Sequence, residues 1–127
     1  MTPAQWSEVD RYFFERLIPA DEALAATLEA NAAFKLPAID VAPNQGQFLQ
    51  ILAQMQGAQS ILEIGTLGGY STIWLARALP PGGRLVTLEV SAKYAKLAEA
   101  NVARAGLGDL VDIRRGPALD TLPQLEA

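Results

Sequence analysis

From residue 60 onward, short apolar runs alternate with amphipathic stretches, and this alternation constrains the fold more than any other feature of the sequence. It predicts strands at residues 60–64 (buried), 84–90 and 110–114, and helices at residues 70–79, 92–105 and from Pro117 toward Leu125. Strands that alternate with helices pair in parallel through right-handed crossovers. The sequence therefore predicts an α/β fold, a Rossmann-like doubly wound parallel sheet of which the chain carries the first three strands.

The residues before this alternation lack a strand pattern and predict a helical lead-in. Helices are expected at residues 4–18, 21–34 and 45–56. The aromatic side chains of Trp6, Tyr12, Phe13 and Phe14 are interpreted as packing, with a dimer or substrate surface as the alternative. We therefore divide the chain into an N-terminal helical segment, residues 1–56, and the first half of a Rossmann-like domain, residues 57–127, which stops before a fourth strand.

The composition excludes several classes of function. The chain has no cysteine and no histidine, so thiolate metal sites, histidine-ligated metals and histidine-based hydrolase triads are excluded within it. A net charge of −4 without a run of Lys or Arg argues against nucleic acid or an anionic membrane as a partner. No apolar stretch reaches the roughly 18 residues of a membrane span, and the N-terminus has no apolar signal core. A cytoplasmic protein is expected.

The first predicted strand leads into a glycine-rich turn, "EIGTLGG", residues 63–69. Glycines let the backbone turn tightly and approach a ligand closely. The dinucleotide fingerprint G-x-G-x-x-G requires a glycine where Leu67 stands. Glu63, just before the turn, would repel a pyrophosphate. The turn therefore indicates a ligand with a cationic end.

Two further features follow the next two strands. Glu89 can accept hydrogen bonds from both hydroxyls of a ribose, and the small residues Gly116, Pro117 and Ala118 leave room for a flat base. Each feature has a simpler structural interpretation, as a turn, a strand-end acid or a helix start. Because ligands of such sheets lie beyond the carboxyl ends of the strands, we expect the three features to form one site. A ligand with a ribose, a base, a cationic end and no phosphates is S-adenosylmethionine (SAM).

With these residues, the sequence resembles the class I SAM-dependent, cation-dependent O-methyltransferase family, which includes catechol and caffeoyl-CoA O-methyltransferases. The resemblance covers nearly the whole chain in four segments, "YFFERLIPADEALAA", "VAPNQGQFLQIL", "ILEIGTLGGYSTIWLARALPPGGRLVTLEV" and "AEANVARAGLGDLVDIRRGPALDTLPQL". It implies methyl transfer from SAM to a hydroxyl of a small catechol-like or phenolic acceptor. It also implies a homo-oligomer, commonly a dimer.

The resemblance further implies which residues bind the cofactor. The amino-acid end of SAM would be held by the residues around the glycine turn and by one backbone contact before it, namely Glu63, Gly65, Thr66, Ser71 and Val41.

The nucleoside end would contact the residues after the second and third strands. Glu89 would bind the ribose hydroxyls, and Val90 would pack on the adenine. Gly116, Pro117 and Ala118 would line the adenine edge. Because proline has no backbone N–H, an adenine hydrogen bond there would come from Ala118.

The family's divalent cation, Mg²⁺ or a similar ion, is bound by an Asp-rich strand end and a later Asp-Asn pair. The sequence stops at "TLPQLEA", before such residues, so we expect no catalytic residue and no metal ligand in this chain. The simplest interpretation is a fragment or truncated form of a longer chain, inactive alone. If the chain ends at Ala127, the strand at 60–64 is an unpaired edge, and we expect it to pair with another chain or to aggregate.

Two other functions stay open at this point. The first is an NAD-type Rossmann domain, against which Leu67 and Glu63 argue. The second is a non-catalytic assembly fragment that completes the sheet of another chain.

Overall fold

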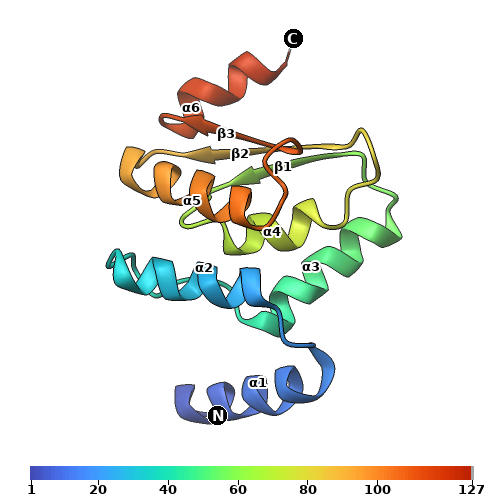
Figure 1. Cartoon of the computed structure of the whole chain (residues 1–127), viewed down its shortest axis with the longest axis vertical. Coiled ribbons are helices and arrows are strands. Elements are labelled where there is room, and N and C mark those ends of the chain that lie inside the picture. The colour runs from blue at the N-terminus through green and yellow to red at the C-terminus, as the bar shows by residue number, and fades with distance from the viewer. Residues whose placement is uncertain (127) are drawn as a thin grey trace.

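The computed structural model describes residues 1–126. In chain order its elements are α1 (Pro3–Leu17), α2 (Glu22–Ala33), α3 (Pro43–Met55), β1 (Ser60–Ile64), α4 (Tyr70–Ala76), β2 (Arg84–Glu89), α5 (Ala92–Arg104), β3 (Val111–Arg115), α6 (Ala118–Thr121) and the 3₁₀ turn η1 (Leu122–Leu125). Figure 1 shows their arrangement.

The three strands form one parallel sheet in the order β1-β2-β3. Ser60 pairs with Arg84 at the start of β1, and Leu85 pairs with Val111 in the second ladder. Each crossover contains a helix, as parallel pairing requires. The predicted fold class, a Rossmann-like parallel sheet of three strands preceded by helices, is confirmed.

The helices lie in layers below one face of the sheet (Figure 1). α4 and α5 cover that face, α2 and α3 pack beneath them, and α1 is outermost, whereas α6 lies on the opposite side. The buried side chains that join these helix layers are Leu24, Tyr70, Ile73, Trp74 and Val102. The helical segment thus packs directly on the α/β part, and the division between residues 56 and 57 stays a prediction.

Side-chain caps fix the starts of three helices. Thr2 and Gln5 form a reciprocal capping box at α1. Asp21 accepts a hydrogen bond from the Leu24 N–H at α2, and Ser91 accepts one from the Tyr94 N–H at α5.

Two predicted helices are shorter than expected. α4 ends at Ala76 instead of residue 79, because the N–H groups of Ala78 and Leu79 donate to carbonyl oxygens three residues back, as in a 3₁₀ turn, before Pro80. The helix expected toward Leu125 is one α turn followed by η1. Pro123 lies inside this stretch and lacks the N–H that a continuing α-helix would use.

The prediction that the first strand is buried is wrong for the described residues. β1 pairs only with β2 and forms an edge of the sheet. Leu62 and Ile64, on the face away from α4, are 50% and 61% exposed. On that face the described residues place only the short helix α6, which contacts β2, and the turn η1.

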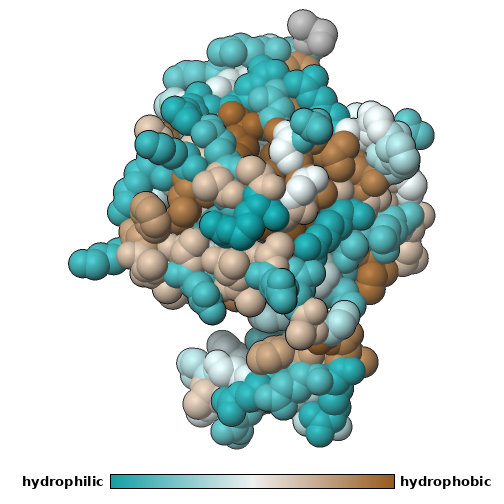
Figure 2. Space-filling model, viewed as in Figure 1, coloured by the Kyte–Doolittle hydropathy of each residue, from teal (hydrophilic) through white to brown (hydrophobic). Residues whose placement is uncertain are grey.

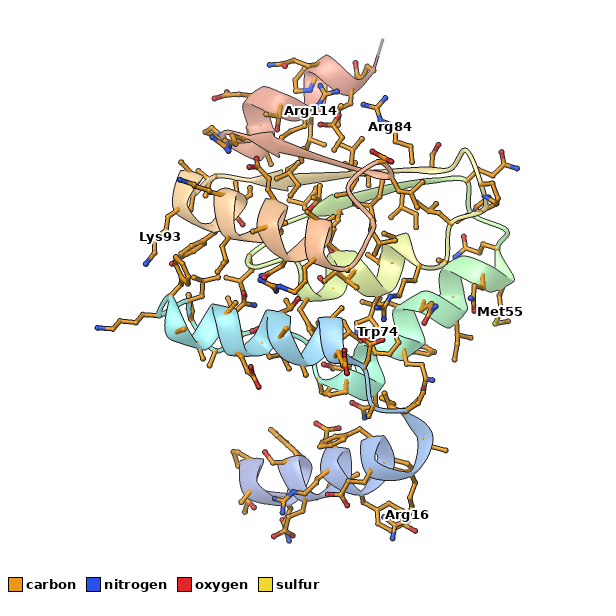
Figure 3. The ribbon with its side chains drawn as sticks, in the orientation of Figure 1. Arg16, Met55, Trp74, Arg84, Lys93 and Arg114 are labelled. Atoms are coloured by element: carbon orange, nitrogen blue, oxygen red, sulfur yellow. The ribbon has the colours of Figure 1, made fainter. Side chains whose placement is uncertain are left out.

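The interpretation of the N-terminal aromatic residues as packing is wrong for three of the four. Trp6, Tyr12 and Phe13 are all exposed, Trp6 by 53%. α1 buries none of its side chains fully, and Figure 2 shows it as a separate lobe below the rest of the molecule. Exposed apolar residues continue on α3, where Met55 lies at the C-terminal end (Figure 3). The dimer or substrate surface considered as the alternative fits this exposure better.

Across residues 1–126, no helix combines the length and the apolar character that crossing a membrane requires.

Candidate cofactor site

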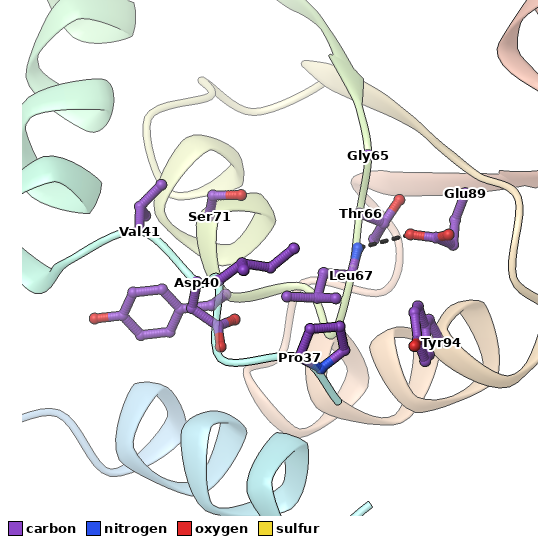
Figure 4. Close-up of a pocket in the computed structure, with 11 residues that line it drawn as sticks. Pro37, Asp40, Val41, Gly65, Thr66, Leu67, Ser71, Glu89 and Tyr94 are labelled. Carbon is purple, nitrogen blue, oxygen red and sulfur yellow. Dashed lines mark hydrogen bonds between the residues drawn. The ribbon is translucent and has the colours of Figure 1, made fainter. Parts of the chain in front are cut away.

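The turn between β1 and α4 has three left-handed residues. Gly65 and Gly69 adopt φ values of 91° and 88°, which glycine tolerates without a Cβ penalty. Leu67 adopts φ 51°, which costs a non-glycine residue about 1–2 kcal/mol. The Leu67 N–H donates a 2.8 Å hydrogen bond to Glu89 Oε2 (Figure 4), and this bond stabilises the turn against that cost.

A cavity of about 340 Å³ opens beside this turn, at the carboxyl ends of β1 and β2. Its size lies in the range of small-molecule sites. It is lined by Pro37, Ile39, Asp40, Val41, Gly65, Thr66, Leu67, Tyr70, Ser71, Glu89 and Tyr94 (Figure 4). Among these lining residues, Asp40 and Glu89 are the charged ones, and none is basic.

Glu89 is buried and links two elements of the site. Its Oε2 accepts the hydrogen bond from Leu67, and its Oε1 accepts one from the Ser91 N–H at 2.9 Å. Each carboxylate oxygen can accept more than one hydrogen bond. The side chain is therefore fixed in position while it keeps acceptor capacity toward the cavity.

Glu63 lies behind the cavity wall, and hydroxyl groups occupy both of its oxygens. Ser71 donates to Oε2 at 2.7 Å, and Thr72 and Thr87 donate to Oε1 at 2.5 and 2.7 Å. Burial raises the pKa of Glu63, against the opposing effect of these hydroxyls. Glu63 thus orients Ser71, which does line the cavity.

Asp40 contributes the second carboxylate of the cavity, from the connector between α2 and α3. Its Oδ1 accepts a 3.0 Å hydrogen bond from the Asn31 amide. Burial raises the pKa of Asp40, and the hydrogen bond from Asn31 opposes that effect. The cavity therefore has a carboxyl group at the connector as well as one at the end of β2.

A sequence profile of the family described as O-methyltransferase matches residues 17–127. The chain belongs to the O-methyltransferase family. A catechol O-methyltransferase of Niastella koreensis is 54% identical over 120 residues, which are 94% of this chain and 54% of the relative. One of Mycobacterium tuberculosis is 52% identical over 93% of this chain and 54% of its own length. The chain thus spans about half the length of the curated relatives it matches.

Solved structures of O-methyltransferases share the fold of this chain. An O-methyltransferase from Bacillus cereus in complex with SAH shares 58% identity at a TM-score of 0.94, over 97% of this chain and 56% of that one. The O-methyltransferase TomG from Streptomyces achromogenes, involved in tomaymycin synthesis and in complex with SAM, shares 48% identity at a TM-score of 0.93. That match covers 100% of this chain and 57% of TomG.

The structure of this O-methyltransferase chain brings five of the predicted cofactor residues together. Val41, Gly65, Thr66, Ser71 and Glu89 line the cavity.

The remaining predicted residues lie outside the cavity lining. Glu63 stands behind the wall, as described above. Val90 is largely exposed at the end of β2. Gly116 is close to the site, since its N–H donates to the carbonyl oxygen of Glu89 at 3.0 Å, and Pro117 and Ala118 follow it at the start of α6.

Sequence reasoning missed several residues that line the cavity, above all Asp40, Tyr70 and Tyr94. Asp40 directly precedes Val41, and Tyr94 lies in the first turn of the helix that follows Glu89. Their positions next to predicted residues in the sequence are the signal by which they could have been identified.

The described residues do not fit a divalent cation. Residues 1–126 contain no group of three or more His, Cys, Asp or Glu side chains arranged to hold a metal ion. The cation that the family resemblance implies is therefore not placed, and no step below depends on it.

Proposed function

We propose that this chain is the cofactor-binding part of a SAM-dependent O-methyltransferase that transfers a methyl group to a hydroxyl of a small catechol-like or phenolic acceptor. The observation that carries the proposal is the cavity beside the glycine turn, whose charged lining residues are both carboxylates. Such a cavity favours a ligand with a positive group over one with phosphates. The named activities and complexes of the relatives support the same assignment.

The described residues fit SAM at both ends. Glu89 would accept hydrogen bonds from the ribose hydroxyls, because both of its oxygens are fixed by backbone N–H groups and keep acceptor capacity. Gly65, Thr66 and Ser71 would contact the amino-acid end, with the backbone of Val41. Glu63 would act one step away, by orienting the Ser71 hydroxyl.

The adenine would lie beyond Glu89, near the residues that follow β3. Val90 would pack on the ring, and Gly116, Pro117 and Ala118 would line its edge. The hydrogen bond from Gly116 to the carbonyl of Glu89 keeps these residues beside the ribose position, which supports this arrangement.

When bound, SAM would supply a methyl group activated by its positively charged sulfur, for transfer to the acceptor oxygen. The contribution of this chain is to hold the donor in one orientation. Recognition of the acceptor and binding of a Mg²⁺-type cation are proposed from the family resemblance alone.

We also propose that the protein self-associates and is cytoplasmic. Two surfaces of the described residues fit self-association, namely the free edge of β1 and the exposed aromatic side chains of α1. Exposed apolar patches of this kind commonly mark interaction sites. The cytoplasmic location rests on the sequence alone.

Isothermal titration calorimetry tests the cofactor assignment. We expect the protein to bind SAM and its demethylated product S-adenosylhomocysteine (SAH), and to bind NAD more weakly than either. Replacement of Glu89 by Gln should weaken both SAM and SAH, since both contain the ribose. Absence of SAM and SAH binding, or tighter binding of NAD, would contradict the proposal.

A further inference from the structure

Two charged residues line the cavity, and the cofactor contacts proposed above use Glu89 but not Asp40. It lies on the connector between α2 and α3, beside Val41, whereas Glu89 lies beside Thr66 at the end of β2 (Figure 4). Glu89 has a backbone N–H on each oxygen. Asp40 has its side-chain partner, Asn31, on Oδ1 and retains acceptor capacity on Oδ2.

Asn31 is held by a second buried amide. It is 3% exposed, and its Oδ1 accepts a 3.2 Å hydrogen bond from Nδ2 of Asn101, which is completely buried on α5. The same Asn101 nitrogen donates to the carbonyl oxygen of Gly68 at 2.8 Å. Arg104 donates to the Asn101 Oδ1 at 2.8 Å. These hydrogen bonds connect α5, α2, the glycine turn and the connector that carries Asp40.

Close packing makes this connection rigid. A Cβ atom added to Gly68 would overlap all the polar atoms of the Asn31 side chain. The Asn31 amide therefore packs directly on the glycine turn while it donates to Asp40. A shift of the turn relative to Asp40 would break hydrogen bonds of two buried amides, which is costly because buried polar groups without partners are destabilising.

The charged groups of the cavity indicate which kind of ligand group Asp40 would bind. No basic side chain is among the described residues that line the cavity, so Asp40 has no cationic partner there. Partial desolvation raises the pKa of Asp40, and a cation in the ligand would stabilise its ionised form. SAM carries one positive charge more than SAH, on the sulfonium sulfur.

We propose that Asp40 is a specificity-determining residue that favours the sulfonium cofactor SAM over its neutral-sulfur product SAH. Asn31 and Asn101 are positioning residues that act through Asp40. This inference rests on the proposed function, since it takes SAM as the ligand. Its consequence is that loss of the methyl group weakens binding at Asp40 and thereby favours release of the product.

The test is calorimetric titration of the wild-type protein and the Asp40→Asn variant with SAM and SAH. Asn has nearly the same shape as Asp, so the variant removes the charge with little change in packing. We expect the Kd for SAM to rise about tenfold, from the lost attraction between the carboxylate and the sulfonium charge, and the Kd for SAH to change less than about threefold. The ratio of the two Kd values is the readout.

Glu89→Gln is the matched control, since it removes the other carboxylate of the same cavity. It should raise both Kd values by similar factors and leave their ratio unchanged. If Asp40→Asn raises both Kd values equally, or changes neither, the inference is wrong. If the wild-type protein binds neither SAM nor SAH, the proposed function itself fails, which is a different result.

Asn31→Ala tests the positioning role. A purely structural residue would lower the melting temperature without changing the ratio of Kd values. We expect Asn31→Ala to lower the preference for SAM in the wild-type background and to have no further effect on that preference in the Asp40→Asn background. An equal change of the ratio in both backgrounds would show that Asn31 does not act through Asp40.

Discussion

Gly68 lies where the glycine turn meets the side chain of Asn31. A Cβ at this position would overlap the Asn31 amide, which itself is bonded to Asn101 and Asp40. We expect Gly68→Ala to lower the free energy of unfolding by about 1–3 kcal/mol, as overpacking in a closely packed site does. Urea unfolding followed by circular dichroism measures this. Gly108→Ala is the control, because no atom lies within 4 Å of a Cβ built there.

The buried carboxyl group of Glu63 leads to a prediction of how the free energy of unfolding depends on pH. Burial raises its pKa above the usual 4.5, so the folded protein holds this proton more tightly than the unfolded chain does. The stability from this group is complete below pH 4.5 and is lost as the pH rises through the folded-state pKa. We expect Glu63→Gln to flatten the decline in the free energy of unfolding as the pH rises above 4.5. A variant with the same slope as the wild type would contradict this.

For individual residues, the sequence predicts those site residues that have a direct chemical signature, and it misses those that packing brings to the cavity. Glu89 was recognisable because it follows a strand at the spacing of a ribose-binding acid. Asp40 carries no such signature, since it lies in an irregular connector whose path depends on the contact of Asn31 with the glycine turn. Glu63 was predicted as a ligand contact, whereas three hydroxyls occupy it, and no sequence pattern indicates that those hydroxyls converge.

The elements of the helical segment are joined to the α/β part by a pair of charges. Arg77, at the end of α4, donates to Asp21 Oδ2 at 2.7 Å, and Asp21 also caps α2. Hydrogen bonding from Arg77 lowers the pKa of Asp21. Its stabilising effect is therefore present above pH 3.8 and is lost as the pH falls through the lower folded-state value.

Two variants of Asp21 separate the cap from the ion pair. Asp21→Asn keeps a good N-cap but loses the charge, and we expect it to cost about 0.5–1 kcal/mol, since the pair is partly exposed. Asp21→Ala loses the cap as well and should cost about 1 kcal/mol more. Thermal unfolding at neutral pH measures both. Equal stability of the two variants would show that the cap contributes nothing.

The order and type of the elements followed from the sequence because their signals are local. The first strand was predicted with the same bounds as β1, and the other strands within one residue at each end. The helix at Pro117 failed because Pro123 interrupts it, a local signal that was present but not used. The exposure of Trp6, Tyr12 and Phe13 could not be predicted, since the same spacing describes a helix packed on a core and a helix that presents its apolar side chains outward.

At the scale of the whole molecule, the layers of the described residues leave β1 as an open edge. Within residues 1–126 the backbone of β1 pairs with β2 alone, and Leu62 and Ile64 are exposed on this strand. An exposed apolar edge strand is a template for pairing with another chain. The charge of −4 on 127 residues provides only modest repulsion between copies. We therefore expect a polypeptide of residues 1–127 alone to sediment as a species larger than a monomer, or to aggregate.

The edge of β1 and the aromatic side chains of α1 are two described surfaces that fit this association, and matched substitutions distinguish them. Leu62→Lys with Ile64→Lys places two charges on the edge strand, where lysine opposes pairing. Trp6→Lys with Phe13→Lys adds the same charge to α1. We expect sedimentation velocity to show that the β1 variant shifts toward the monomer and that the α1 variant does so less. A wild-type chain that runs as a single monomeric species would contradict the prediction, and a larger shift in the α1 variant would assign the association to α1.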